Sequence, residues 1–239
     1  MIISHKHRFI FVKTTKTAGT SVELALSRIC GPDDVITPVA PADEAARREM
    51  GGRPAQNFLV PFGAYRGADW WHLIAGNGRR EYRNHTTAET IRRYVGHAVW
   101  TSYFKFSIER DPFDKAISRY YWSTQPPRPP LSEFLRTTRE SHLSNWRIYA
   151  IDDRVAVDFV VRYERLAEDL STVATRLGLP EIALPRAKAG HRESRAHYSS
   201  LLDADARARI ELVCAREIAE FGYRWCDRTQ ELPPSSTDQ

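Results

Sequence analysis

The chain has 239 residues, of which 42% are hydrophobic and 27% are charged. These fractions are close to the averages of globular proteins, so they exclude a disordered chain and a repetitive fibre. The formal net charge is +5. This excess is too small to indicate a nucleic-acid-binding protein, but it is compatible with a small anionic ligand.

The sequence shows no targeting or metal-binding pattern. No apolar run is long enough to cross a bilayer, and the N-terminus lacks a secretory signal, so we expect a soluble, cytoplasmic protein without a membrane span. The three cysteines, Cys30, Cys214 and Cys226, are far apart and form no CxxC or Cys/His cluster. We interpret them as reduced thiols and expect neither a disulfide framework nor a zinc site.

The chain begins with a strand and a helix that a polar loop joins. Residues 9–12 (FIFV) are aromatic and β-branched, which is typical of a strand buried on both faces. Residues 19–29 place apolar side chains among good helix formers and predict a helix. Residues 37–86 contain Gly, Pro, Arg and aromatics without long periodicity. We expect an irregular insertion there that contributes substrate contacts.

Strand and helix patterns then alternate to the end of the sequence, which predicts an α/β fold. We expect three layers, with a mostly parallel central sheet flanked by helices, in a single domain over 1–228; the polar residues 229–239 predict a disordered tail. The strand patterns cover 103–108 and 158–162, and the helical patterns cover 87–95, 166–177, 203–221 and a helix that begins at Pro112.

A loop rich in Lys, Thr, Gly and Ser joins the first strand to the first helix. In such a unit, successive backbone N–H groups and the positive end of the helix face one point, where an anion can bind. Gly19 allows close backbone approach, and the hydroxyls of Thr17, Thr20 and Ser21 add donors. Lys16 adds a compact positive charge. The sequence therefore predicts a phosphate-binding loop over 16–21.

This loop differs from the Walker A loop of nucleoside triphosphatases. The pattern GxxxxGK[ST] is absent, because Lys16 precedes the glycine instead of following it. No predicted strand ends in the Asp that would hold magnesium. We therefore expect phosphate binding that requires no metal.

A second segment, FSIERDPFDKAIS at 106–118, reads as a strand, an Arg-Asp-Pro turn and a helix. Arg110 ends the strand, and Ser118 follows about two helical turns into the helix. Together with KTAGTS at 16–21, this segment resembles the PAPS-dependent sulfotransferases, in particular the carbohydrate-type branch related to bacterial sulfotransferase family 2. Residues 158–170 (DFVVRYERLAEDL) and 215–225 (AREIAEFGYRW) are similar to the late elements of that branch.

The resemblance implies a P-loop-type fold and a reaction. A sulfotransferase of this branch moves the sulfuryl group of 3′-phosphoadenosine 5′-phosphosulfate (PAPS) to a hydroxyl or amine of a carbohydrate or other small molecule, and releases adenosine 3′,5′-bisphosphate. By resemblance, Arg110 and Ser118 would bind the 3′-phosphate. Lys16 is our candidate for stabilising the leaving oxygen. The 5′-phosphate would be bound by the loop residues Lys16, Thr17, Ala18, Gly19, Thr20 and Ser21.

The reaction also needs a base for the proton of the acceptor. Residues 82–88 (YRNHTTA) resemble the version of the acceptor pocket that uses histidine, which implies His85. The ordinary histidine pKa of about 6.5 suits proton abstraction near neutrality. Glu23, in the first turn of the helix after the loop, and His72 are alternatives.

Two further clusters have more than one interpretation. Basic residues at 186–195 resemble a loop that closes over the nucleotide, with Lys188 and Arg192 as its first candidates, but a solvated charge run has the same composition. Tyr65, Trp70 and Trp71 could stack on an acceptor or form a core of the insertion itself.

Two other functions stay open at this stage. A P-loop-type small-molecule kinase would need a metal-binding Asp near the end of a strand. A non-catalytic nucleotide-binding module would leave Lys16 and His85 dispensable. Signatures of RNA-binding proteins are missing, so we expect no nucleic-acid partner. The sequence identifies neither the acceptor nor the oligomeric state.

Overall fold

The computed structural model describes residues 1–184 and 196–227. These residues divide into two compact units: unit 1 contains the described residues within 1–109 and 145–187, and unit 2 contains those within 110–144 and 188–239. The expectation of a single domain over 1–228 stays a prediction, and the tail at 229–239 lies outside the described residues.

Unit 1 is built on a five-stranded sheet. Its strands are β1 (Ile2–Ser4), β2 (Phe9–Val12), β3 (Val35–Ile36), β4 (Phe104–Glu109) and β7 (Phe159–Arg162), in the spatial order β3-β1-β2-β4-β7. β2, β4 and β7 run parallel, whereas β1 is antiparallel to its neighbours β2 and β3. The predicted α/β class with a mostly parallel central sheet is confirmed, and its P-loop type stays a prediction.

The predicted strands at 9–12, 103–108 and 158–162 correspond to β2, β4 and β7. β1 and β3 were not predicted from the sequence. They have only three and two residues, too few for an alternating pattern to show.

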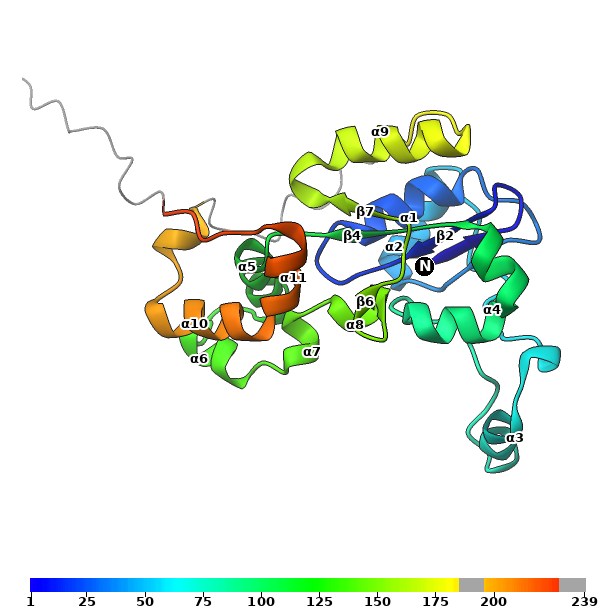
Figure 1. The fold of residues 1–239 in the computed structure, drawn as a ribbon, viewed down its shortest axis with the longest axis horizontal. Coiled ribbons are helices and arrows are strands. Elements are labelled where there is room, and N and C mark those ends of the chain that lie inside the picture. The colour runs from blue at the N-terminus through cyan, green and yellow to red at the C-terminus, as the bar shows by residue number, and fades with distance from the viewer. Residues whose placement is uncertain (185–195, 228–239) are drawn as a thin grey trace, which may run out of the picture. The chain divides into compact units, whose positions relative to one another are not determined.

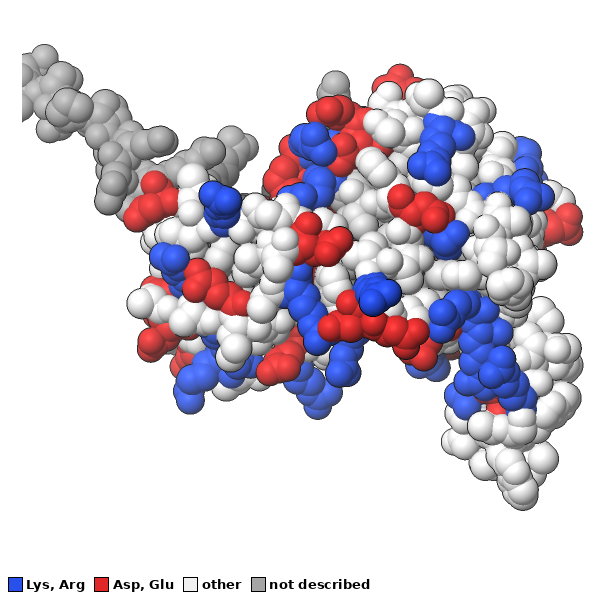
Figure 2. Space-filling view, viewed as in Figure 1, with Lys and Arg blue, Asp and Glu red and all other residues white. Residues whose placement is uncertain are grey.

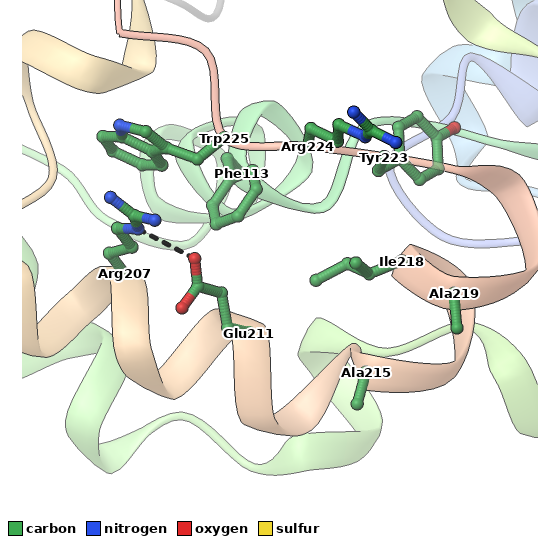
Figure 3. A pocket seen from close by; sticks show the side chains of 9 residues that line it. All are labelled: Phe113, Arg207, Glu211, Ala215, Ile218, Ala219, Tyr223, Arg224 and Trp225. Carbon is green, nitrogen blue, oxygen red and sulfur yellow. Dashed lines mark hydrogen bonds and ion pairs between the residues drawn. The ribbon is translucent and has the colours of Figure 1, made fainter.

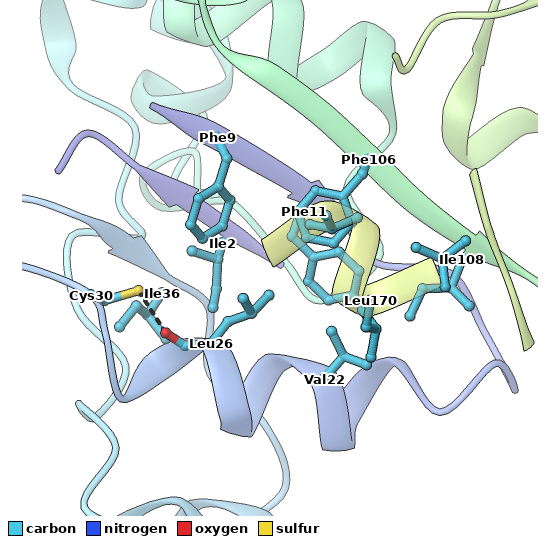
Figure 4. Close-up of a cluster of buried hydrophobic side chains, with 12 residues drawn as sticks. Ile2, Phe9, Phe11, Val22, Leu26, Cys30, Ile36, Phe106, Ile108 and Leu170 are labelled. Carbon is cyan, nitrogen blue, oxygen red and sulfur yellow. Dashed lines mark hydrogen bonds between the residues drawn. The ribbon is translucent and has the colours of Figure 1, made fainter. Parts of the chain in front are cut away.

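Two helices share an apolar core with one face of the sheet. These helices are α1 (Gly19–Ser27) and α9 (Leu166–Leu177), as the residue patterns predict. Figure 4 shows Val22 of α1 beneath Phe11 of β2 and Phe106 of β4, whose rings stack with their centroids 5.1 Å apart. This packing fixes the point where α1 leaves the sheet.

The other face of the sheet is covered by α4 (Ala88–Ser102) and α8 (Trp146–Tyr149), which lie opposite α9 in Figure 1. All four residues of β2 are buried as a result. The predicted helix over 87–95 ends where Gly96 adopts a φ of 79°, but the chain continues beyond this kink as a second helical segment of α4. A short hairpin, β5 (Ala150–Ile151) and β6 (Arg154–Val155), follows α8.

We expected an irregular insertion at 37–86, but part of this segment is helical. It contains α2 (Pro41–Glu49) and α3 (Gly67–Ile74), preceded by the 3₁₀ turn η1 (Phe62–Ala64). The helical period of α2 is hidden in the sequence because its fully buried residue is an arginine, Arg47, and not an apolar side chain.

Unit 2 is helical in its described part. Its core contains Phe113, Ile117, Leu135 and Ile210. The single helix predicted over 203–221 is wrong, because Cys214 leaves the helical conformation (φ −104°, ψ 21°) and divides it. The elements are α5 (Pro112–Ser123), α6 (Leu131–Thr137), α7 (Glu140–Leu143), η3 (Tyr198–Ser200), α10 (Ala204–Val213) and α11 (Ala215–Phe221).

A buried ion cluster ties α1 to the rest of unit 1. Glu23 of α1 is fully buried; Lys13 Nζ lies 2.6 Å from its Oε2, and Arg47 Nη2 lies 3.0 Å from its Oε1. The amine of Met1 lies 3.2 Å from the same Oε1. Burial alone would raise the pKa of Glu23, but the Met1 amine, Lys13 and Arg47 outweigh it and hold the pKa below its ordinary value.

We predict that Glu23→Gln destabilises the protein strongly, because it leaves buried cations without their counter-charge. The expected loss is roughly 3–5 kcal/mol in the free energy of unfolding, measured by urea denaturation at neutral pH. The matched control is Glu81→Gln, in an exposed ion pair with Arg83, which should cost less than about 1 kcal/mol.

The same substitution gives a pH test. The pKa of Glu23 is lower in the folded than in the unfolded chain, so its stabilisation is present above the unfolded value and is lost as the pH falls through the folded value. The stability gap between wild type and Glu23→Gln should therefore shrink in acid. A gap that stays constant with pH would contradict the ionised state of Glu23.

Candidate functional site

The loop between β2 and α1 has the backbone of an anion-binding site. Lys16 and Ala18 both adopt left-handed conformations, with φ of 60° and 61°, whereas Thr17 and Gly19 do not. An alternation of this kind turns successive N–H groups to one side of the chain. The N-cap residue of α1, Ala18, makes no side-chain cap. The first turn of α1 therefore offers its backbone donors to an external acceptor.

These conformations are unfavourable for residues other than glycine. A non-glycine residue in the left-handed region costs of order 1 kcal/mol, and such residues cluster at ligand sites. Lys16 and Ala18 stand two residues apart, at the turn itself. The left-handed conformations of the backbone over 16–18 therefore lower the stability of the folded protein.

Gly19 is required by packing inside the protein. A Cβ atom at this position would lie 2.9 Å from Cγ of Lys13 and 3.2 Å from the carbonyl oxygen of Thr14. The Lys13 side chain passes over Gly19 on its way to Glu23. From the sequence, we explained Gly19 by the close approach of a ligand to the backbone. In the structure, the absence of a side chain at this position makes room for the buried side chain of Lys13.

The hydroxyl groups of the loop have different surroundings. The Thr17 hydroxyl lies 2.8 Å from that of Thr14, whose Oγ1 also donates to the carbonyl oxygen of Ile108. Thr17 is fully buried, and its hydroxyl is already engaged with Thr14. Thr20 is half-buried and Ser21 is buried in the first turn of α1.

His85 lies beside the start of this loop. Its Nδ1 is 3.0 Å from the carbonyl oxygen of Lys13. Because a carbonyl oxygen can only accept, Nδ1 carries the proton in this hydrogen bond, and Nε2 of the neutral ring keeps its lone pair. Loss of hydration lowers the pKa of His85 to about 4, and the hydrogen bond to Lys13 only partly opposes this shift. Part of the side chain still faces solvent. At neutral pH the side chain is therefore neutral and can accept a proton.

The two other candidates for the base, Glu23 and His72, do not lie where His85 does. Glu23 is buried and ionised within the Lys13 and Arg47 cluster, so it serves as a counter-ion there. His72 belongs to α3, which projects away from the sheet in Figure 1. Of the three residues, His85 is the one whose side chain hydrogen-bonds to the backbone at the start of the loop, at Lys13.

Asn145 is a residue of the site that the sequence did not indicate. Its Oδ1 accepts from the backbone N–H of Thr15 at 3.1 Å and from the Thr15 hydroxyl at 2.9 Å, while its Nδ2 donates to the Thr15 carbonyl oxygen at 3.1 Å. Nδ2 also donates to Glu109, which accepts a second bond from Tyr149. Asn145 and Glu109 are fully buried. The amide thus ties the loop to the end of β4.

Arg110 and Ser118 belong to unit 2. Arg110 follows directly on β4, and its Nε donates to Oδ2 of Asp114 at 2.8 Å. Asp111 caps α5 by accepting from the N–H of Phe113. Ser118 is half-buried on α5. Lys188 and Arg192, the candidates from the late basic loop, lie outside the described residues.

Unit 2 contains a cavity of about 420 Å³ that none of the sequence-predicted site residues lines. Arg207 lies against Trp225, with 4.7 Å between its guanidinium carbon and the ring centroid, and it pairs with Glu211 at 2.8 Å. Figure 3 shows these side chains beside Phe113 among the residues that line the cavity. Within residues 1–184 and 196–227, no group of three or more His, Cys, Asp or Glu side chains could hold a metal ion. No helix in the described part of the chain is long and apolar enough to span a membrane.

We predict that Asn145→Ala loosens the loop. The substitution leaves the buried groups of Thr15 and Glu109 without this partner, which should lower the free energy of unfolding by about 2–3 kcal/mol. Amide hydrogen exchange of residues 13–20 should rise more than that of β4. The control, Asn77→Ala at an exposed position of the insertion, should change neither. Uniform exchange in all elements would argue against a local role.

Comparison with known proteins agrees with the motifs. The sequence matches the sulfotransferase family over residues 1–224. An uncharacterized protein of Archaeoglobus fulgidus is 34% identical over 101 residues, which cover 38% of this chain and 81% of that protein. No solved structure gives a significant match. Because the family match includes the loop at 16–21, the Arg-Asp-Pro segment and the late elements, the chain belongs to the sulfotransferase family.

Proposed function

We propose that this protein transfers the sulfuryl group of PAPS to a hydroxyl or amine of a carbohydrate or other small-molecule acceptor. The observation that carries the proposal is the contact between His85 and the loop: a neutral imidazole, 3.0 Å from the carbonyl oxygen of Lys13, stands beside a backbone turn suited to a phosphate. A base and an anion site side by side are what an in-line transfer requires. The family match supports sulfuryl transfer as the reaction.

The loop would hold the 5′-phosphate of the donor. Backbone N–H groups of residues 17–20 and the positive end of α1 would bind the phosphate oxygens. The half-buried Lys16 would add its charge where the leaving oxygen develops a negative charge. Asn145 would act on the loop only through Thr15, as a positioning residue.

In the chemical step, one bond to sulfur forms and another breaks. The acceptor oxygen or nitrogen forms a bond to sulfur, and the bond between sulfur and the bridging oxygen of the 5′-phosphate breaks. The electron pair of the broken bond stays on that oxygen, next to Lys16. The proton of the acceptor passes to Nε2 of His85, the ring nitrogen not engaged with Lys13.

The remaining residues would bind the rest of the donor. By resemblance to the Arg-Asp-Pro segment of the family, we assign the 3′-phosphate to Arg110, which stands two residues before α5, and to Ser118 in the second turn of α5. Arg110 is paired with Asp114 in the structure, so a phosphate would have to share or replace that partner. Lys188 and Arg192 are proposed as further contacts to the nucleotide. These roles require no metal ion.

The donor can be tested by thermal shift. We predict that adenosine 3′,5′-bisphosphate raises the melting temperature, because ligand binding to the folded state stabilises it, and that ATP with magnesium has a much smaller effect. Arg110→Ala should lose most of the bisphosphate shift, whereas Lys16→Ala should lose only part of it, because the backbone donors to the 5′-phosphate remain, and should reduce kcat by roughly 10²–10³. The control Lys6→Ala, at an exposed lysine, should behave as wild type.

Two results would contradict this assignment. A larger shift with ATP and magnesium, together with phosphoryl transfer, would identify a kinase. A bisphosphate shift without any turnover in wild type, across acceptors of several classes, would identify a nucleotide-binding module.

We predict a specific pH dependence for the base. Because His85 must be neutral to accept a proton, kcat/KM should fall in acid around its lowered pKa of about 4, not near 6.5. His85→Ala should reduce kcat by roughly 10²–10⁴ and remove this acidic limb. The control His97→Ala, at an exposed position of α4, should keep both. Circular dichroism at each pH would confirm that the enzyme stays folded, and an unchanged limb in His85→Ala would disprove the assignment.

A further inference from the structure

Part of the insertion forms a closed arm. Its base is a short antiparallel ladder in which Val60 N–H donates to the Arg80 carbonyl oxygen at 2.9 Å and Tyr82 N–H donates to that of Phe58 at 2.7 Å. The chain between them, 61–79, contains η1 and α3. In Figure 1 this segment projects from the sheet of unit 1. We refer to residues 58–82 as the aromatic arm.

The aromatic arm concentrates the exposed apolar surface of the described chain. Trp71 and Ile74 of α3 are 73% and 74% exposed. They stand three residues apart, so they lie on the same side of the helix. Single exposed apolar residues are common, but a contiguous group of them marks an interaction site. The seven large exposed apolar side chains of the described residues are Leu59, Phe62, Trp70, Trp71, Ile74, Trp122 and Leu212, and the first five belong to the arm.

The arm is held rigidly in this exposed state. Asp69 of α3 is fully buried, and it accepts from the N–H of Arg66 at 3.0 Å, from Arg80 Nε at 2.9 Å and from the Tyr94 hydroxyl at 3.0 Å. Arg93 of α4 adds an ion pair at 2.5 Å. These bonds fix the position of α3 on the ladder and on α4, so the fold itself holds Trp71 and Ile74 in exposed positions.

Inside the arm, three rings pack on one another. Phe62 stacks on Trp70 with a centroid distance of 5.6 Å, and Tyr65 meets both rings edge-on at 5.2 Å. Tyr65 is buried in this stack, whereas Phe62 and Trp70 keep 45% and 44% of their surface exposed. Of the two interpretations that the sequence allowed, a core of the insertion therefore applies to Tyr65 and to the packed faces of Phe62 and Trp70. Trp71 is not part of this stack and faces outward.

The charge around the exposed side chains is positive. Arg66 and Arg79 are exposed, and the guanidinium of Arg79 lies 4.3 Å from the ring centroid of Phe62. Arg80 and Arg93 keep about a third of their side chains exposed, while their carboxylate partner Asp69 is buried. Figure 2 shows blue, basic surface along one side of the arm and white, uncharged surface over its tip. An anionic partner complements this rim.

We propose that the aromatic arm docks this protein on an anionic lipid surface. Trp71 and Ile74 would enter the interface between headgroups and acyl chains, where tryptophan is favoured, and the arginines of the rim would face anionic headgroups. This inference does not depend on the proposed transferase reaction.

Two other occupants fit the arm less well. In a symmetric dimer that joins two arms, the same patch would face itself, so the arginine rims of both copies would oppose each other. A soluble glycan would stack on Trp71, but Ile74 and Leu59 offer it no stacking face, and the one carboxylate of α3, Asp69, is already bound by the scaffold.

Vesicle co-sedimentation tests the proposal. Wild-type protein should bind vesicles of phosphatidylcholine with phosphatidylglycerol, bind pure phosphatidylcholine much less, and dissociate with added salt. Trp71→Ser with Ile74→Ser should weaken binding at least about tenfold. Arg66→Gln with Arg79→Gln should weaken it by a similar factor at low salt only.

The chain offers a matched control for the apolar pair. Trp122 and Leu212 of unit 2 are 57% and 75% exposed, so Trp122→Ser with Leu212→Ser removes a comparable pair outside the arm and should leave binding unchanged. Melting temperature and circular dichroism of each variant would exclude unfolding.

Several outcomes would overturn the proposal. These are no binding to anionic vesicles, equal losses in the arm variant and its control, or a wild-type dimer that the arm variant converts to a monomer. Binding of a soluble acidic polysaccharide without vesicle binding, lost in the arm variant, would assign the surface to a glycan instead.

Discussion

The candidate site depends on one buried ion pair, between Lys13 and Glu23. Lys13 is the first residue after β2, and its ammonium group, its aliphatic stem and its backbone carbonyl group each make a contact in the site. Its ammonium group binds Glu23 at 2.6 Å and Asn84 at 3.1 Å, its stem crosses Gly19, and its carbonyl oxygen holds His85. A charge as deep as Glu23 is tolerated only with such partners. The pair therefore sets the path of the loop, the start of α1 and the place of His85 together.

The hydrogen bonds of Asn145 secure the same loop from its other side. Lys13 anchors the strand end of the loop, whereas Asn145 holds Thr15 and, through Glu109, the end of β4. Between these anchors, Lys16 and Ala18 adopt their left-handed conformations. Strained backbone persists in proteins only where its surroundings over-determine it. The two buried polar contacts supply that constraint and leave the first turn of α1 for a ligand.

The sequence predicts those parts of the molecule that have a strong local pattern. β2, β4 and β7 follow from short apolar runs, α1 and α9 follow from helical patterns, and the loop at 16–21 follows from its residue types and its place between strand and helix. Buried polar contacts leave no such trace: Asn145 and Thr15 are 130 residues apart in sequence. Arg47 and Cys214 show the same limit. Arg47 hides the helical period of α2, because the buried residue of this helix is charged. Cys214 divides α10 from α11, but it continues the apolar stripe and so leaves no break in the sequence pattern.

The packing at Gly19 changes how substitutions in this loop should be interpreted. Glycines in loops of this kind are usually explained by a ligand that needs close approach to the backbone. Here an added methyl group would first meet Lys13, at 2.9 Å, and so would disturb an ion pair inside the protein. An inactive variant at position 19 would therefore report on folding of the core. Genetic evidence for what the loop binds has to come from Lys16, whose side chain begins at the turn itself.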